Sequence, residues 1–239
     1  AEVAAFHESF GDMSAMLTAL QLKSVREEVI AETAGKLDRS SRLSRLAEQL
    51  GWAIRQGHPD AVDRDCLRNA ANSLFYSDPM TLPPSAPATQ LSSEPHSFSR
   101  IFTGAFLEIL AGMFRTQTKK DEAALLVAAQ DAATILINGI KASPVVPTYY
   151  SQVAAHMLDV DVAQFNGRYR NALKSGFVRH GVLSLQAATT PPPPKEPRGA
   201  RRALATIAPG VQDAPLTQIA LPAAELGLPE DLLVSAASH

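Results

Sequence analysis

Apolar and polar residues alternate with a helical period along most of the chain up to residue 185. In residues 3–22, apolar side chains recur at steps of three and four, at Phe6, Phe10, Met13, Leu17 and Leu20. This spacing places them on one face of a helix. The opposite face carries small residues and two carboxylates, namely Glu8, Asp12, Ala15 and Ala19. We therefore expect a helix that is buried on both sides, with its carboxylates at an interface between layers.

Similar periodicity predicts helices along the rest of this region. We expect a helix over residues 23–35, with Gly35 as its C-cap. Further helices are predicted within 41–54, 62–76, 97–114, 119–142, 143–160 and 162–177. Strand signals are almost absent. The sequence predicts an all-α fold, a bundle-like lobe of several helices that spans residues 1–186.

Two segments interrupt this pattern. Residues 77–95 contain five prolines in nineteen positions, which exclude a continuous helix or a central strand. A loop of this length can shape or cover a cleft. Residues 187–202 are rich in proline and basic residues and are expected to form an extended linker. Residues 203–239 are expected to be a poorly structured tail or the start of a further segment.

The composition excludes several classes of function. The chain has 239 residues and a formal net charge of −2, so it lacks the basic excess of a nucleic-acid-binding protein. No apolar run approaches the roughly 20 residues that span a bilayer. A single cysteine, Cys66, excludes an internal disulfide framework and leaves the compartment open. The sequence opens inside a predicted helix, without methionine or a signal segment, so we expect a piece of a longer chain or a processed protein.

Two short stretches carry candidate chemistry. In "HESFGD", Glu8 and Asp12 lie four residues apart on one helix face, where one carboxylate can bind a metal and the other can orient a neighbouring ligand. The same pair could simply complement the helix dipole. In "EPHSFSRIFTGAF", His96 lies at the junction of the proline-rich loop and a hydrophobic helix. A histidine there can donate to an oxyanion, or it can be an ordinary capping or loop residue.

Together, the two stretches resemble the C-terminal part of the thermolysin-like zinc metallopeptidases, the gluzincins. That family carries Asn-Glu-x-x-x-Asp on a helix, which Glu8 and Asp12 match, with His7 in place of the asparagine. It also carries His-x-x-Ser-x-Ile-x-x-x-Ala-aromatic at a later loop-to-helix junction. This second pattern is matched by His96, Ser99, Ile101, Ala105 and Phe106. The resemblance covers roughly residues 1–183 and includes the helical lobe that follows the motifs.

The resemblance implies a role for each of these residues. Glu8 would be the third zinc ligand, and Asp12 would hydrogen-bond and orient another ligand. His96 would stabilise the tetrahedral intermediate of peptide hydrolysis. The implied cofactor is zinc, and the implied substrate is a peptide or protein.

The sequence also departs from the family. The His-Glu-x-x-His motif, which supplies two zinc ligands and the general base about twenty residues before the third ligand, is absent. His7 and Glu8 cannot replace it, because Gly11 stands where its second histidine would be. Leu91 stands where the family has an acidic partner for the catalytic histidine, and Glu94 is the nearest carboxylate. Phe98 and Arg100 replace an asparagine and a glycine, so we expect different substrate contacts.

These observations favour the C-terminal portion of a zinc-dependent metalloendopeptidase, whose partner is the N-terminal part of the same protein. One carboxylate cannot hold a zinc ion that takes three or four ligands. We therefore predict that residues 1–239 alone neither retain zinc nor cleave peptides. The alternative is a non-catalytic helical interaction module that derives from the same fold.

Overall fold

The helices pack around one long apolar helix, α4 (Pro95–Thr116), in a computed structural model that describes residues 1–186. Sixteen of the 22 residues of α4 are buried, because apolar or small side chains occupy nearly every position after its first turn. The predicted linker over 187–202 and the predicted tail over 203–239 lie outside the described residues. Within the described part, the fold is mostly helical, as predicted, and has one very short sheet.

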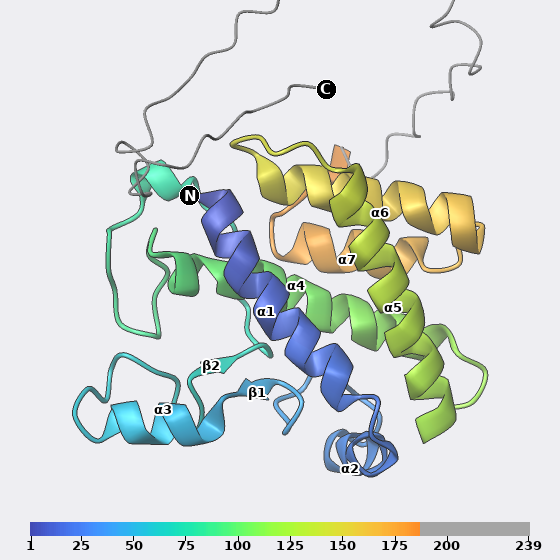
Figure 1. Cartoon of the computed structure of the whole chain (residues 1–239), viewed down its shortest axis with the longest axis horizontal. Coiled ribbons are helices and arrows are strands. Elements are labelled where there is room, and N and C mark those ends of the chain that lie inside the picture. Colours follow the sequence, from blue (N-terminus) through green and yellow to red (C-terminus); the bar gives the residue numbers. More distant parts are fainter. Residues whose placement is uncertain (187–239) are drawn as a thin grey trace, which may run out of the picture. The chain divides into compact units, whose positions relative to one another are not determined.

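Four further helices surround α4 (Figure 1). The first helix, α1 (Glu2–Ala19), packs along α4, and α7 (Arg170–Arg179) packs against another side of it. The pair α5 (Glu122–Ala142) and α6 (Tyr149–Phe165) pack against each other and complete the bundle. Short side chains allow close contact between α4 and α7: a Cβ at Gly112 would lie 2.6 Å from the Cβ of Ala172. These five helices are called the bundle below.

An aromatic cluster joins the helices of the bundle. The ring of Phe102 on α4 lies 4.9 Å from Phe6, 5.2 Å from Tyr150 and 5.5 Å from Phe177, measured between ring centroids. These partners come from α1, α6 and α7. Edge-to-face aromatic pairs contribute about 0.5–1.5 kcal/mol beyond the area that they bury. The cluster therefore fixes how four helices meet.

Polar contacts fix α1 along its axis. Both carboxylate oxygens of the buried Glu2 accept hydrogen bonds, one from the hydroxyl of Tyr76 at 2.6 Å and one from the backbone N–H of Tyr150 at 2.7 Å. About two turns further on, the hydroxyl of Ser9 donates to the backbone carbonyl of Ser99 at 2.8 Å. The first half of α1 is thus attached to α4, to α6 and to the segment before α4.

Residues 36–94, called the irregular segment below, differ from the prediction. After α2 (Lys23–Thr33), the chain forms strand β1 (Arg45–Leu46), helix α3 (Glu48–Arg55), strand β2 (Arg68–Asn69) and a 3₁₀ turn, η1 (Pro79–Thr81). The two strands pair in antiparallel fashion, with Arg45 opposite Asn69.

The predicted helix over 41–54 is wrong in its first half. Leu43 and Leu46 are buried as the spacing suggested, but they lie in a turn and a strand. Helix α3 starts only after Ala47, which has a positive φ of 50°. Leu50, which follows Leu43 and Leu46 at helical spacing, is 52% exposed.

The predicted helix over 62–76 is also wrong. Asparagine side chains replace the helical backbone bonds there: Asn69 Oδ1 accepts from the N–H of Ala71, and Asn72 Oδ1 accepts from the N–H of Leu74. Such local bonds compete with helix formation. The last predicted helix, 162–177, has wrong boundaries as well. Helix α6 continues to Phe165, and positive φ angles at Asn166 and Gly167 separate it from α7.

Two of the bundle helices, α4 and α5, are long and apolar enough by length and composition to cross a membrane. The apolar window of α4 is 89% buried inside the protein, and that of α5 is 39% buried. The core helix of a soluble protein passes the same test, so the two lengths alone do not establish a membrane span.

Candidate functional site

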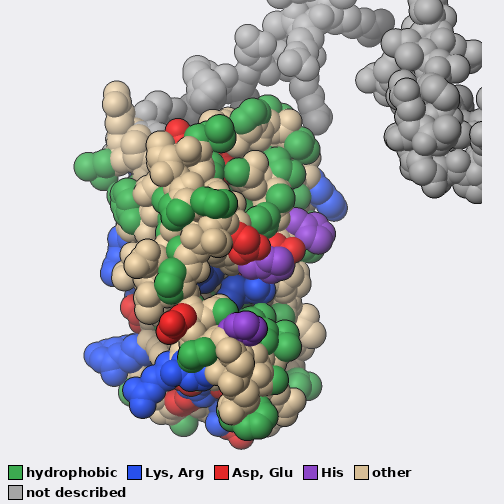
Figure 2. Space-filling view, turned by 90° about the vertical axis from the view of Figure 1, so that its left-hand side faces the viewer, with side chains coloured by type: hydrophobic (Ala, Val, Ile, Leu, Met, Phe, Trp, Pro, Cys, Tyr) green, Lys and Arg blue, Asp and Glu red, His purple; other side chains and the backbone are tan. Residues whose placement is uncertain are grey.

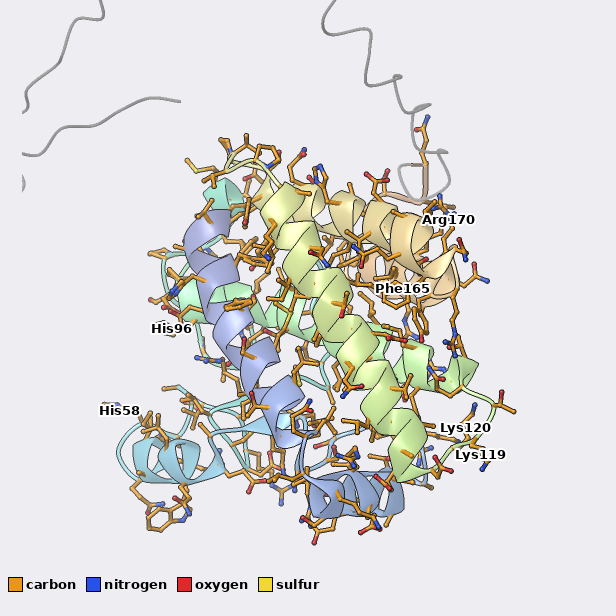
Figure 3. The ribbon with its side chains drawn as sticks, turned by 45° about the vertical axis from the view of Figure 1, so that its right-hand side comes forward. His58, His96, Lys119, Lys120, Phe165 and Arg170 are labelled. Carbon is orange, nitrogen blue, oxygen red and sulfur yellow. The ribbon has the colours of Figure 1, made fainter. Side chains whose placement is uncertain are left out.

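The fold brings Glu8 and His96 together from two different helices. Glu8 lies in the second turn of α1. His96 lies in the first turn of α4 and is labelled in Figure 3. Glu8 Oε2 is 3.3 Å from His96 Nε2. The side chain of Glu8 is 30% exposed and that of His96 is 59% exposed, so both can reach a ligand.

Glu94 orients the imidazole of His96. Its Oε1 lies 2.5 Å from His96 Nδ1, and the same carboxylate caps α4 by accepting from the backbone N–H groups of His96 and Ser97. Burial would raise the pKa of Glu94, but these hydrogen bonds outweigh it and hold the pKa below its usual value. Glu94 is therefore ionised at neutral pH, and each ring nitrogen of His96 faces a carboxylate. A carboxylate therefore bonds to the ring of His96, although the position where an acidic partner was expected holds the apolar Leu91.

Asp12 is buried one turn beyond Glu8, and its partners belong to this chain. Arg68 holds it with two contacts, from Nη2 to Oδ1 at 2.8 Å and from Nε to Oδ2 at 3.3 Å. The hydroxyl of Thr103 on α4 also donates to Oδ2 at 3.3 Å. That Asp12 orients a metal ligand stays a prediction.

Arg68 is a residue that the sequence reasoning missed. It lies on β2, in a stretch that was predicted to be helical, and it reaches α1 across the fold. A buried carboxylate such as Asp12 requires a compensating cation or hydrogen bonds. That requirement signals that a partner exists, but it does not indicate which of the arginines supplies it.

The face of α1 opposite its apolar stripe agrees with the prediction only in part. Asp12 is buried at an interface with α4 and β2, as expected. Ala15 on the same face is exposed, however, and the side chain of Glu8 is 30% exposed. The apolar face carries Phe6, Met13 and Leu20 into the core as predicted.

A pocket of about 290 Å³ opens beside His96. Its wall combines Arg68, the first turn of α4 and the proline-rich loop, which supplies Ser85, Ala86 and Ala88. This agrees with the expectation that the loop shapes a cleft. Figure 2 shows the corresponding face, where basic side chains lie recessed between histidine and acidic side chains. The pocket gives a ligand access to His96.

The remaining titratable candidates do not extend the site. Within residues 1–186, no group of three or more His, Cys, Asp and Glu side chains could hold a metal ion. Cys66 is buried, and burial together with nearby Asp63 raises the pKa of its thiol to about 12. It therefore stays protonated at neutral pH and is a poor nucleophile.

Comparisons with known proteins identify no relative. No family model matches the chain, and no curated protein or solved structure matches it.

Proposed function

We propose that this chain is the helical C-terminal lobe of a thermolysin-like zinc metallopeptidase, which hydrolyses peptide bonds. In this proposal Glu8 is the third zinc ligand and His96 stabilises the tetrahedral intermediate. The observation that carries the proposal is the 3.3 Å approach of Glu8 Oε2 to His96 Nε2. The two motifs come from distant parts of the sequence, and His96, which Glu8 contacts, lines a pocket.

The described residues, 1–186, do not by themselves fit a zinc ion. A catalytic zinc takes three protein ligands, and the described residues offer no such group. Glu8 would supply one ligand, so the other two and the general base would have to come from outside these 239 residues. When bound, zinc polarises a carbonyl and activates water. No step through the metal follows from the described residues.

His96 is well placed to stabilise developing negative charge. Its Nδ1 is held by Glu94, so the orientation of the ring is fixed and Nε2 points toward Glu8. A protonated imidazole donates from both nitrogens. A preorganised donor aimed at an oxyanion contributes about 10²–10³ in rate. Glu94 acts here by positioning the ring.

Zinc content and peptide hydrolysis test the proposal in the protein expressed with its natural upstream coding sequence. Glu8→Gln is expected to lose both bound zinc and activity, whereas Glu27→Gln on the exposed surface of α2 keeps both. His96→Gln is expected to keep zinc and to lower kcat by about 10²–10³, with exposed His58→Gln as the matched control. An upstream sequence without His-Glu-x-x-His, or zinc binding that survives Glu8→Gln, would contradict the proposal.

The second candidate is a non-catalytic helical interaction module. One observation favours it: Glu8 and Glu94 each bond to His96, and Asp12 bonds to Arg68 and Thr103, so these groups already have partners without a metal. For a module, Glu8→Gln lowers the free energy of unfolding and leaves the zinc content unchanged at zero. Both candidates predict that the 239-residue chain alone neither retains zinc nor cleaves peptides. Stoichiometric zinc in that chain would contradict both.

A further inference from the structure

Arg100 is a buried cation without a carboxylate partner. It is 7% exposed, and all its hydrogen bonds go to uncharged groups: the backbone carbonyls of Ala88, Gln90 and Ser97 and the hydroxyl of Ser97. Among the described residues, no carboxylate lies within ion-pair distance of it. The other buried arginine, Arg26, pairs with Glu122 at 2.6 Å.

Among residues 1–186, one N–H group of the Arg100 guanidinium has no hydrogen-bond acceptor. Arginine has five N–H groups, and four of those in Arg100 take part in the bonds above. Burial lowers the pKa of Arg100, while the charge of Asp63 opposes this shift, yet an arginine side chain remains charged in proteins. A buried charge without a counter-ion is costly unless something compensates it. Arg100 lines the pocket beside His96.

Three charged side chains, Arg68, Glu94 and Arg100, line this pocket together with His96. Arg68 is neutralised by Asp12. Glu94 also lines the pocket, but its oxygens are used by His96 and by the N–H of Ser97. The charges of Asp63 and Glu94 act on Arg100 from beyond ion-pair distance, so among the described residues no carboxylate is in direct contact with its guanidinium. Because the negative Glu94 is already in the wall, a carboxylate, with one charge, is favoured over a phosphate group, with nearly two.

The rest of the wall suits the stem of an acidic side chain. Ala61, Leu67, Ala86 and Ala88 provide apolar surface, against which methylene groups can pack. A volume of about 290 Å³ is at the lower end of ligand pockets and is sufficient for one side chain.

We propose that this pocket binds the carboxylate of an acidic side chain in a peptide substrate, with Arg100 as the group that selects it. The proposal rests on the proposed function for the identity of the ligand as a peptide. Arg100 stands where the resembled family has a glycine, so this selectivity would be particular to this chain. The carboxylate forms the ion pair that Arg100 lacks, and the peptide backbone then lies beside His96.

Peptide binding to the 239-residue chain tests this inference without zinc or hydrolysis. The probes are acetyl-Ala-Ala-Glu-Ala-Ala-amide, the same peptide with Gln in place of Glu, and the Gln peptide with a free C-terminal carboxylate. Affinities are measured at constant ionic strength from amide and arginine Nε–H signals in NMR titrations. The Glu peptide is expected to bind at least about tenfold more tightly than the Gln amide, because a charge-assisted bond replaces a neutral one.

Variants at Ala86, in the proline-rich loop, test the preference without removing the Arg100 side chain that holds this loop. Arg100→Gln is expected to remove the preference, but it also releases the loop carbonyls and can unfold the chain. Ala86→Glu places a carboxylate in the pocket wall and is expected to remove the preference, whereas Ala86→Gln, of the same size, keeps it within about twofold.

Three results would overturn the inference. They are equal affinity for the Glu and Gln amides, a preference for the free C-terminus over the Glu side chain, and no binding of the Glu peptide at about 10 mM. A different result contradicts the proposed function, namely that the longer protein contains no zinc. If zinc is absent but the preference for Glu persists, the pocket remains a binding site for acidic peptides in a non-catalytic module.

Discussion

The bundle and the irregular segment are held together in different ways. In the bundle, apolar side chains such as Phe102 pack on all sides, and their stabilisation grows with the area removed from water. In the irregular segment, individual polar side chains hold the backbone: Asn69 and Asn72 bond to nearby N–H groups, and Arg100 bonds to two loop carbonyls. Burial is shared among many residues, whereas each polar contact is local and directional. The candidate site lies where the two regions meet.

The strongest test of this comparison is a pair of matched aromatic truncations. Phe102→Ala in the bundle is expected to lower the free energy of unfolding by about 4 kcal/mol, because it leaves a cavity at the centre of the aromatic cluster. Phe75→Ala in the irregular segment, where the ring is 58% exposed, is expected to cost less than about 1 kcal/mol. Urea unfolding of both variants measures the difference. Equal losses would contradict the proposed contrast.

A smaller effect is expected for the ion pair that joins the two regions. Arg68→Gln leaves Asp12 buried without its cation, which is expected to cost about 3 kcal/mol. Adding Asp12→Asn should recover part of that loss, because the uncompensated charge is then gone. The control is Arg42→Gln, whose side chain is 48% exposed in a surface pair and should cost less than about 0.5 kcal/mol. A double variant no more stable than Arg68→Gln alone would argue against a charge effect.

The smallest effect at neutral pH involves His180, which also links the two regions. Its Nδ1–H donates to the carbonyl of Leu74 at 2.7 Å, its Nε2 lies 3.6 Å from Glu108, and Arg179 is nearby. Burial lowers the pKa of His180, although its contacts with Leu74 and Glu108 oppose the shift.

The unfolded chain therefore takes up this proton first as the pH falls below about 6.5, so stability is full above that value and declines below it. Free energies of unfolding between about pH 7.5 and 5 should fall, and His180→Gln should flatten the profile while exposed His58→Gln leaves it unchanged. An unchanged slope in His180→Gln would rule out this group as the cause.

The long helices could be predicted from the sequence because their apolar pattern and their burial coincide. The prediction of a helix over 97–114 is confirmed by α4, and that over 119–142 by α5. The pattern failed where apolar side chains are buried without a helix, as at Leu43 and Leu46. A positive φ at Ala47, which alanine seldom adopts, leaves no trace in the sequence. The Asn166–Gly167 pair did carry a signal for the break before α7.

Within the candidate site, the sequence predicted only residues that belong to the two motifs or lie next to them. Glu8 and His96 could be singled out from their spacing, and Glu94 lies close enough in sequence to be considered. Arg68 could not be assigned, because its position depends on the pairing of β1 with β2 and on its distance from α1, which are properties of the tertiary fold.

Helix α1 is held by hydrogen bonds of Glu2 to Tyr76 and Tyr150 and of Ser9 to the carbonyl of Ser99. These bonds set the rotation of α1 about its axis, and each residue along an α-helix advances that rotation by about 100°. One residue inserted between Glu2 and Glu8 would turn the carboxylate by more than a quarter of a circle, away from the imidazole. Substitutions along the exposed side of α1 leave that angle intact, whereas changes in helix length between these two acids do not.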